Sequence, residues 1–260
     1  MARIGYENEI GGKERMQIRD LTIVPLPNEQ YIVTAVDISA AIGEKPCDTL
    51  RVPPELTGKM AARVALLEVM ASGAEIIAVN DVVGAEMEPT GRRVIAGIQE
   101  ELQLAHLGHL ELNGSTEENM ATMQTSVGVT VIGLASRSQL KVNHIKKDAL
   151  LFGYGEPRMG NELLEKPDLE VTYDFITELV KRDDVLELVP VGSKGILYEA
   201  SHLAQLNDCT FIEKAQCPQN WLSKSAGPAT TVLIAVDYEG ANAFMQAFPN
   251  AYILGRLIKK

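Results

Sequence analysis

Three aspartates stand next to apolar runs in the first third of the sequence. Asp20 precedes one such run, Asp37 follows a second, and Asp81 comes with Asn80 near the end of the apolar segment 75–83. A buried carboxylate without a partner costs several kcal/mol or takes up a proton. We therefore expect a metal ion, another cation or a cluster of donors beside Asp81, unless Asp81 only caps the next segment or makes a turn.

The oxygen ligands that these aspartates offer suit Mg²⁺, which usually takes one or two carboxylates together with substrate phosphates. Softer metals would need thiolate or imidazole ligands. The sequence has three cysteines without a CxxC motif and four scattered histidines, so we expect free thiols in a reducing compartment and no structural zinc site. We predict a nucleotide–Mg²⁺ site with Asp20, Asp37 and Asp81 as metal ligands.

The polar segment 1–19 carries glycines, which allow the backbone to approach an anion closely. Gly11 and Gly12 precede Lys13, whose ammonium group is a point charge for phosphate. The sequence contains neither GxxxxGK[ST] nor GxGxxG, which excludes a P-loop and a Rossmann fingerprint. We expect a flexible segment, which is either a disordered tail or a flap that carries Lys13 to the phosphates.

The elements that position these residues follow from the hydrophobic pattern. Two β-branched runs form a hairpin that brings Asp20 and Asp37 to neighbouring ends of its strands. The pattern then predicts strands at 20–24, 31–36, 75–83 and 126–135, helices at 56–72 and 89–107, and a polar loop at 113–119. The order β-β-α-β-α-β indicates an α+β sheet with both helices on one face.

The other face of this sheet is expected to be apolar. The residues that we expect to need cover there are Val79, Val83, Val129 and Val131. A second subunit or the rest of the chain would have to supply that cover.

A basic connector at 141–147 leads into a second mixture of strands and helices. The pattern predicts strands at 148–152, 210–214, 230–236 and 251–258, a short apolar run at 185–189, and helices near 158–165, 170–181, 192–206 and 238–248. We therefore divide the chain into a flexible segment (1–19), an amino-terminal domain (20–138) and a carboxy-terminal α+β domain (139–260).

The net charge of −11 argues against binding to nucleic acid or to an anionic membrane. No apolar run approaches the roughly 20 residues that span a bilayer, and the amino terminus lacks the apolar stretch of a signal peptide. We expect a cytoplasmic protein with a small-molecule substrate.

Five stretches, in order, resemble a known family: RDLTIV, VTAVDIS, TGKMAARVALLEVMASGAEIIAVND, NGSTEEN and SVGVTVIGLA. They are similar to the ATP-binding superfamily of aminoimidazole ribonucleotide (AIR) synthetase, thiamine-monophosphate kinase, selenophosphate synthetase and a hydrogenase maturation factor. The resemblance covers most of residues 13–136. It continues more weakly through KKDALLFGYG, GSKGILYEASHLAQ and AYILGRL.

The resemblance implies a homodimer in which the amino-terminal domains pair into a barrel-like sheet, with a second α+β domain behind. It also implies that ATP lies between the domains, with its phosphates held by Mg²⁺ on aspartates. Asp20, Asp37 and Asp81 match the family's metal-binding positions, and residues 113–116 match its GGDT-type loop. The nucleotide contacts that we expect are Gly11, Gly12, Lys13, Asn80, Asp81, Gly114 and Thr116.

Some positions depart from the family pattern. Ser115 stands where the loop usually has an acid, although Glu117 and Glu118 follow closely. Arg19 stands where the kinases often have another aspartate, and Gly192 and Lys194 replace acids of a turn that serves the substrate in the thiamine kinase. These departures make thiamine phosphate an unlikely substrate, and the length and the reduced acidic set resemble those of the α-ribazole kinase of cobalamin (cobamide) salvage.

We predict an ATP- and Mg²⁺-dependent kinase that phosphorylates a hydroxyl of a nucleoside-like substrate, with α-ribazole as the favoured one. Asp37 and Lys13 would be catalytic, Lys13 by neutralising charge on the transferred phosphoryl group. Two alternatives stay open. One is an ATP-dependent amide-activating ligase or cyclase of the same superfamily, and the other is a noncatalytic ATP-binding regulatory protein.

Overall fold

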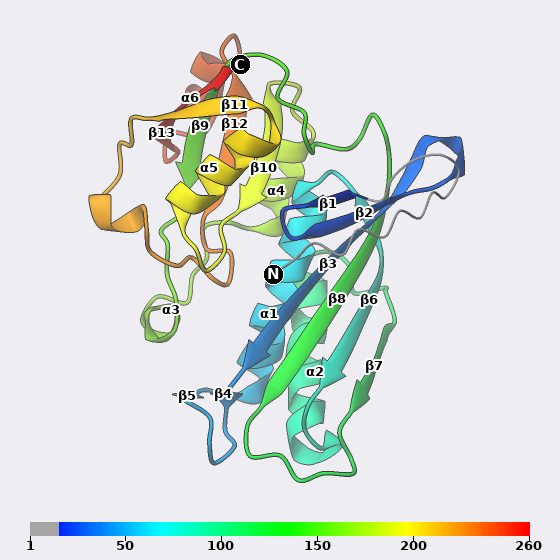
Figure 1. Cartoon of the computed structure of the whole chain (residues 1–260). Helices are drawn as coiled ribbons and strands as arrows, with labels where there is room; N and C mark the ends of the chain where they lie inside the picture. Colours follow the sequence, from blue (N-terminus) through cyan, green and yellow to red (C-terminus); the bar gives the residue numbers. More distant parts are fainter. Residues whose placement is uncertain (1–15) are drawn as a thin grey trace, which may run out of the picture.

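The computed structural model describes residues 16–260 (Figure 1). Gly11, Gly12 and Lys13, for which we predict contacts with phosphate, lie outside the described residues. Within residues 16–260, no helix has both the length and the apolar character that crossing a membrane requires.

The first half of the chain builds a six-stranded sheet in the order β1-β2-β3-β8-β6-β7. All neighbours pair antiparallel except β6 and β7, which are parallel. Its strands are β1 (Met16–Ile18), β2 (Leu21–Pro25), β3 (Gln30–Ala40), β6 (Glu75–Val83), β7 (Leu112–Thr116) and β8 (Ser126–Ser136). The predicted hairpin is confirmed as β2 and β3, which are joined by the short helix η1 (Pro27–Glu29).

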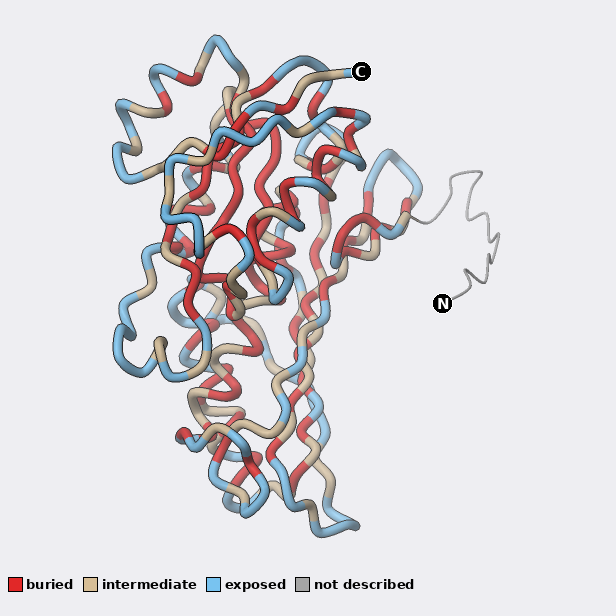
Figure 2. The backbone as a smooth tube through the Cα atoms, turned by 60° about the vertical axis from the view of Figure 1, so that its left-hand side comes forward, coloured by how far each residue is buried: buried red, intermediate tan, exposed pale blue. Residues whose placement is uncertain are grey.

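The long strands of this sheet alternate between a buried face and a more exposed one, as Figure 2 shows along the backbone. The central strands β3 and β8 are rich in Val and Ile, whose branched side chains pack well on a pleated surface. They pair along 11 positions, and the register places Asp37 opposite Val129. Because Val129 also pairs with Asp81, the two aspartates flank this valine from opposite sides.

Two helices, α1 (Pro54–Ala71) and α2 (Arg92–Leu104), cover one face of the sheet (Figure 1). Helix α2 turns Val94, Ile98 and Leu102, at spacings of four residues, toward the core, where all three are buried. Helix α1 is buried on nearly every side, because it also contacts α4 (Tyr173–Val180) and β10 (Val185–Pro190) of the second half.

The valines that we expected on the uncovered face of the sheet lie on the helix-covered face instead. These four residues are fully or almost fully buried: Val79, Val83, Val129 and Val131. An apolar open face does exist, but Val36, Ile38 and Val82 form it, with 62%, 68% and 62% of their surface exposed. Successive residues of a strand point to opposite faces of the sheet. The side chains of the open face are therefore displaced by one residue along the strand from those that we predicted there.

The second half builds a five-stranded antiparallel sheet in the order β10-β12-β9-β13-β11. Its strands are β9 (Ala149–Tyr154), β10 (Val185–Pro190), β11 (Cys209–Glu213), β12 (Val232–Asp237) and β13 (Tyr252–Lys259). Its helices are α3 (Asn161–Glu165), α4 (Tyr173–Val180), α5 (Ile196–Leu206), the short η3 (Gln219–Trp221) and α6 (Ala241–Ala247). The predicted boundary at 138/139 falls between β8 and β9, while one hydrophobic cluster continues through both halves.

Several elements differ from the sequence prediction. The predicted polar loop at 113–119 begins as the edge strand β7, and the short pair β4 (Ile42–Gly43) and β5 (Leu50–Arg51) interrupts the loop before α1. The helix predicted from residue 89 begins at Arg92, after a π-helical turn, Met87–Gly91. The strands β3 and β6 extend past their aspartates, so Asp37 and Asp81 lie inside strands rather than at strand ends.

Candidate functional site

Asp20 and Asp37 come together at the turn between β1 and β2. Leu21 pairs with Ala35, so Asp20 lies level with the residue just before Asp37 on the neighbouring strand. Burial raises the pKa of Asp37 to about 6, although the Ile38 backbone hydrogen bond lowers it, and the charge of Asp20 raises it further. The predicted proximity of these two carboxylates is therefore present in the structure.

Two glutamates complete this acidic group. Glu68 lies on α1 and Glu199 lies in the first turn of α5, and both are buried. Burial, with added repulsion from Asp20, Glu199 and Asp37, raises the pKa of Glu68 to about 8. Burial and the charge of Asp20 raise the pKa of Glu199 to about 7. The cluster joins side chains from the first sheet, its covering helix and the second half of the chain.

Arg19 supplies the cation within this group. It adopts φ 55° in the turn after β1, and its Nη1 donates a 2.8 Å hydrogen bond to the carbonyl oxygen of Leu188 on β10. Its positive charge lowers the pKa of both Glu68 and Glu199. Within residues 16–260, its buried Nε and Nη2 atoms have no hydrogen-bond partner, and neither has Oε2 of Glu68. Arg19, which departs from the family pattern, thus ties the two halves together.

The loop that contains Lys194 borders the same cluster. Gly195 has φ 81°, and a Cβ there would lie 2.8 Å from the Lys224 carbonyl oxygen, so the entry into α5 requires glycine. The Lys194 ammonium donates to the Tyr198 hydroxyl at 3.0 Å and lies over the Tyr198 ring. The charges of Glu199 and Asp20 raise the pKa of Lys194, after the larger effect of the Tyr198 hydrogen bond. The turn that the resemblance assigns to the substrate therefore lies beside the acidic group.

Asp81 stands apart from Asp20 and Asp37. It faces the helices, is 3% exposed, and its Oδ2 has no hydrogen-bond partner within the described part of the chain. Burial raises its pKa to about 6. Its backbone lies two strand spacings, about 10 Å, from that of Asp37. Within residues 16–260, no group of three or more His, Cys, Asp or Glu side chains is arranged to hold a metal ion.

The side chains at the end of β7 and just after it are engaged in local hydrogen bonds. The hydroxyl of Thr116 donates to Glu118 Oε1 at 2.7 Å, and the same oxygen accepts the Met87 backbone N–H. Glu117 Oε1 accepts the backbone N–H groups of Asn119 and Met120. These two acids stabilise the loop. That Glu117 or Glu118 replaces the acid that the family has at the position of Ser115 stays a prediction.

Gly114, a predicted nucleotide contact, packs directly against Asp81. A Cβ at this position would lie 2.3 Å from Asp81 Oδ1, so the strand pair has no space for a side chain there. Asn80 lies one residue before Asp81 on β6 and faces the open side of the sheet, where it pairs with Asn113 and Thr130. The predicted nucleotide contacts on β6 and β7 are thus divided between the two faces.

Sequence reasoning overlooked Glu68 and Glu199. Glu68 carried a signal, because it interrupts the apolar helical stretch VALLEVMA, where a lone charge at a buried position needs a partner. Glu199 carried no comparable signal, since its burial depends on the packing of α5 against the first half.

The comparisons with known proteins agree with the motifs. Residues 19–135 match the family model described as AIR synthase related protein, N-terminal domain, which spans β2 to β8. No curated protein sequence matches the chain.

Solved structures share the fold over most of the chain. Thiamine monophosphate kinase from Aquifex aeolicus has a TM-score of 0.64 at 15% identity, covering 94% of this chain and 90% of that chain. T. maritima PurL complexed with AMPPCP has a TM-score of 0.63 at 15% identity, covering 91% and 42%. E. coli HypE, a hydrogenase maturation protein, has a TM-score of 0.64 at 15% identity, covering 87% and 80%. The resemblance to the AIR synthase-like superfamily and the mixed α+β fold are thus confirmed.

Proposed function

We propose that this chain, in which residues 19–135 match the AIR synthase related N-terminal domain, is a Mg²⁺- and ATP-dependent phosphotransferase. Its acceptor would be a hydroxyl group of a nucleoside-like small molecule, for which we favour α-ribazole in cobalamin salvage. The observation that carries the proposal is the group of four carboxylates around Arg19, where the two halves of the chain meet. The shared fold with an AMPPCP-bound protein and with a kinase supports it.

The residues present fit Mg²⁺ through Asp20 and Asp37. Magnesium is commonly bound by one or two protein carboxylates while phosphate oxygens and water complete its octahedral shell. A divalent cation would also relieve the repulsion that contributes to the raised pKa of Asp37. Asp81 stays in the proposed metal set because of its buried, unpartnered Oδ2, at a position separate from this pair. The ion, when bound, would neutralise charge on the phosphates.

The other residues would position the reactants. Phosphoryl transfer depends mainly on alignment and on stabilisation of charge in the transition state. Asp37 would act in catalysis as a ligand that holds the ion on the transferred phosphate. Lys194 places a cation beside Glu199 and Asp20, and we propose Lys13 as a second cation for the transferred phosphoryl group.

The open face of the first sheet supports the proposed homodimer. Val36 and Ile38 on β3 and Val82 on β6 are exposed apolar side chains on this face, and β8, between these two strands, contributes Gly128 and Thr130. A second copy of the same face would bury these side chains in a self-complementary contact.

We also propose a cytoplasmic location, which is consistent with the free thiols of Cys47, Cys209 and Cys217.

A coupled ADP-release assay with a panel of acceptors tests the proposal. The panel contains α-ribazole, thiamine phosphate and ribonucleotide amidines, and the fate of the γ-phosphate is followed by ³¹P NMR. Transfer to an acceptor hydroxyl supports the kinase. Release of ADP together with inorganic phosphate, while a new amide or ring forms, indicates the ligase or cyclase instead. Tight Mg²⁺–ATP binding without turnover of any acceptor indicates the regulatory protein.

A further inference from the structure

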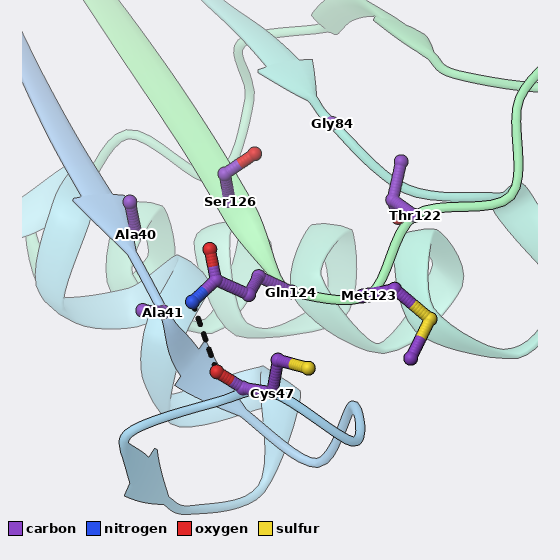
Figure 3. Close-up of a pocket in the computed structure, with 8 residues that line it drawn as sticks. All are labelled: Ala40, Ala41, Cys47, Gly84, Thr122, Met123, Gln124 and Ser126. Atoms are coloured by element: carbon purple, nitrogen blue, oxygen red, sulfur yellow. Dashed lines mark hydrogen bonds between the residues drawn. The ribbon is translucent and has the colours of Figure 1, made fainter.

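Two pockets lie at opposite ends of β6. One, of about 490 Å³, follows the end of the strand at Gly84 and is drawn in Figure 3. It borders the open face on which we place the homodimer contact, because Gly84 comes two residues after Val82. The other, of about 350 Å³, lies where β6 begins, at Glu75. We call this second one the junction pocket, and it is separate from the acidic group around Arg19.

Both halves of the chain line the junction pocket. The first half contributes the end of α1, the start of β6 and the turn after α2. The second half contributes α4, which lies beside the upper end of α1 (Figure 1). Thr177, Val180 and Lys181 share one side of this helix, at spacings of three and four residues. The apolar side chains of the lining are Met70, Ala74, Ile76, Ala105, Leu107 and Val180.

Hydrogen bonds join the walls of the junction pocket to one another. His106 Nε2, in the turn after α2, lies 2.9 Å from Asp174 Oδ1 at the start of α4. The Lys141 backbone N–H donates to the Ser72 carbonyl oxygen at the end of α1, at 2.9 Å. Lys141 Nζ donates to the Arg182 carbonyl oxygen just after α4, at 2.7 Å. The walls are therefore held in place around the pocket, and small-molecule sites are usually pre-formed in this way.

A negative and a positive side chain lie on the lining of the junction pocket. Glu75 begins β6 and Lys181 follows the last residue of α4, and both are exposed. The neighbouring Arg182 pairs with Asp184 at 2.6 Å. Within residues 16–260, by contrast, neither Glu75 nor Lys181 forms an ion pair. Both charges are thus available to a ligand.

Gln139 adds a hydrogen-bond donor whose orientation is fixed. Its Oε1 accepts hydrogen bonds from the Ser136 backbone N–H at 2.7 Å and from Ser136 Oγ at 2.8 Å. The amide nitrogen Nε2 can then donate two hydrogen bonds, and an ammonium group such as that of Lys181 also only donates. A carboxylate of the ligand matches Gln139 and Lys181, while an ammonium group of the ligand matches Glu75.

We propose that the junction pocket binds an α-amino acid with a large apolar side chain, such as leucine or phenylalanine. Lys181 and Gln139 would bind its carboxylate and Glu75 its ammonium group. The apolar lining would hold the side chain, and the flexible thioether of Met70 adapts to an aliphatic or an aromatic group. A volume of about 350 Å³ is near the lower end of the range for small-molecule sites, which suits a ligand of this size.

Ligand-observed NMR titrations of the full chain, without nucleotide, test the ligand chemistry independently of the proposed ATP dependence. Leucine and phenylalanine should bind with a Kd of about 1 mM or less, and glycine at least about tenfold more weakly, because glycine leaves the apolar lining uncovered. The analogues 4-methylpentanoate and 3-methylbutylamine are leucine without its ammonium and without its carboxylate group. Each should bind about threefold more weakly than leucine, the effect of one exposed ion pair.

Two results of these titrations would overturn the proposal. One is equal binding of leucine and both analogues, which would show that the charges of the lining are not used. The other is the absence of leucine binding at about 10 mM.

Filling variants locate the ligand. Thr177→Phe would fill the junction pocket from α4 and weaken leucine binding by more than about tenfold. Thr177→Val keeps the size of the side chain, so this matched control should bind leucine as the wild type does. Ala40→Leu would instead fill the pocket in Figure 3 and should leave leucine binding unchanged. Loss of binding in Ala40→Leu but not in Thr177→Phe would place the ligand in that other pocket and overturn the proposal.

Two exposed charge variants, which leave the packing intact, assign the two ends of the ligand. Lys181→Met should weaken leucine binding by about threefold and leave 3-methylbutylamine binding unchanged. Glu75→Gln should weaken leucine binding to the same degree and leave 4-methylpentanoate binding unchanged. Lys214→Met, at another exposed position of the second half, is the control and should bind all three as the wild type does. Unchanged leucine binding in both Lys181→Met and Glu75→Gln would overturn the proposal.

Discussion

Burial controls the protonation of the carboxylates where the two halves of the chain meet. Glu68 has its pKa raised to about 8 by burial first and by neighbouring acids second, and Asp37 has its pKa raised to about 6. A raised pKa means that the folded state holds the proton more tightly than the unfolded chain does. The stability from this effect is fully present below the unfolded pKa and is lost as the pH rises through the folded pKa.

Glu68→Gln should therefore make unfolding less sensitive to pH. Relative to this variant, we expect the wild type to lose a few kcal/mol of unfolding free energy between about pH 4.5 and pH 8, since the glutamine cannot ionise. Urea denaturation at intervals from about pH 5 to pH 9 measures the difference. Glu75→Gln, at an exposed position on β6, is the control. A gap between Glu68→Gln and wild type that stays constant with pH would contradict the assignment.

Asp37→Asn should abolish phosphoryl transfer without weakening the fold. The substitution removes a negative charge that would bind the metal ion. Above about pH 6 this charge is also buried at a cost in free energy, so its removal should keep or raise the thermal stability. Calorimetry with AMPPCP, with and without Mg²⁺, should show that only the Mg²⁺-dependent part of the affinity falls. Asp168→Asn, at an exposed position in the second half, should behave as wild type. Unchanged ATP turnover in Asp37→Asn would refute the proposed role.

The close contact between Gly114 and Asp81 gives a steric test at residue scale. Gly114→Ala should destabilise the protein by about 1–3 kcal/mol, because the new methyl group would lie 2.3 Å from Asp81 Oδ1. Combining it with Asp81→Ala should recover only part of that loss in a double-mutant cycle measured by denaturation, because the Asp81 carbonyl oxygen would still lie 2.6 Å from the new methyl group. Gly192→Ala, whose Cβ would meet its nearest atom at 3.8 Å, is the matched control. Additive losses in the cycle would show that the two sites are independent.

At the scale of elements, the sequence predicts which segments are strands and helices better than it predicts their pairing. Hydrophobic periodicity identified β3, β6 and β8 and the helices α1 and α2, because each has a long apolar pattern. It assigned Val79 and Val129 to the wrong face, since the face turned to the helices depends on register and on the packing of α1. The strand β7 was read as a loop because LNGST has few strand-forming residues, and its pairing with β6 defines it.

The candidate site shows the same division. Asp20 lies near Asp37 as the sequence predicts, because pairing within a hairpin follows from local sequence. Glu199 and the contact of Arg19 with Leu188 depend on how the second half docks, which involves residues 169 positions apart. A local sequence pattern does not predict contacts between residues that are so far apart along the chain.

Arg19 joins the turn before β2 to strand β10, so its removal should loosen the two elements together. Arg19→Gln should lose about 2 kcal/mol of stability near pH 8, because the buried carboxylates of Glu68 and Glu199 lose their cation. The loss should shrink near pH 5, where those groups are protonated. Hydrogen exchange should quicken in both β2 and β10. Arg19→Lys should restore part of the stability, and equal losses at both pH values would contradict the electrostatic explanation.

At the scale of the whole molecule, the open face of the first sheet contrasts with the continuous packing elsewhere. One hydrophobic cluster runs through both halves, and the second sheet is buried along β10 and most of β12. Val36, Ile38 and Val82 remain more than 60% exposed on the central strands of a six-stranded sheet. Clustered apolar exposure on a sheet face usually marks a binding surface.

Ile38→Lys should convert the proposed homodimer into monomers without unfolding them. Ile38 is 68% exposed in the single chain, so a lysine there meets water when alone but meets the like charge of its copy across a two-fold interface. Sedimentation velocity at micromolar concentration should give a dimer for the wild type and a monomer for Ile38→Lys, with equal circular dichroism. Leu164→Lys, at an exposed apolar position on α3, should remain dimeric. A monomeric wild type would refute the proposed homodimer, and a dimer that tolerates Ile38→Lys would place its interface elsewhere.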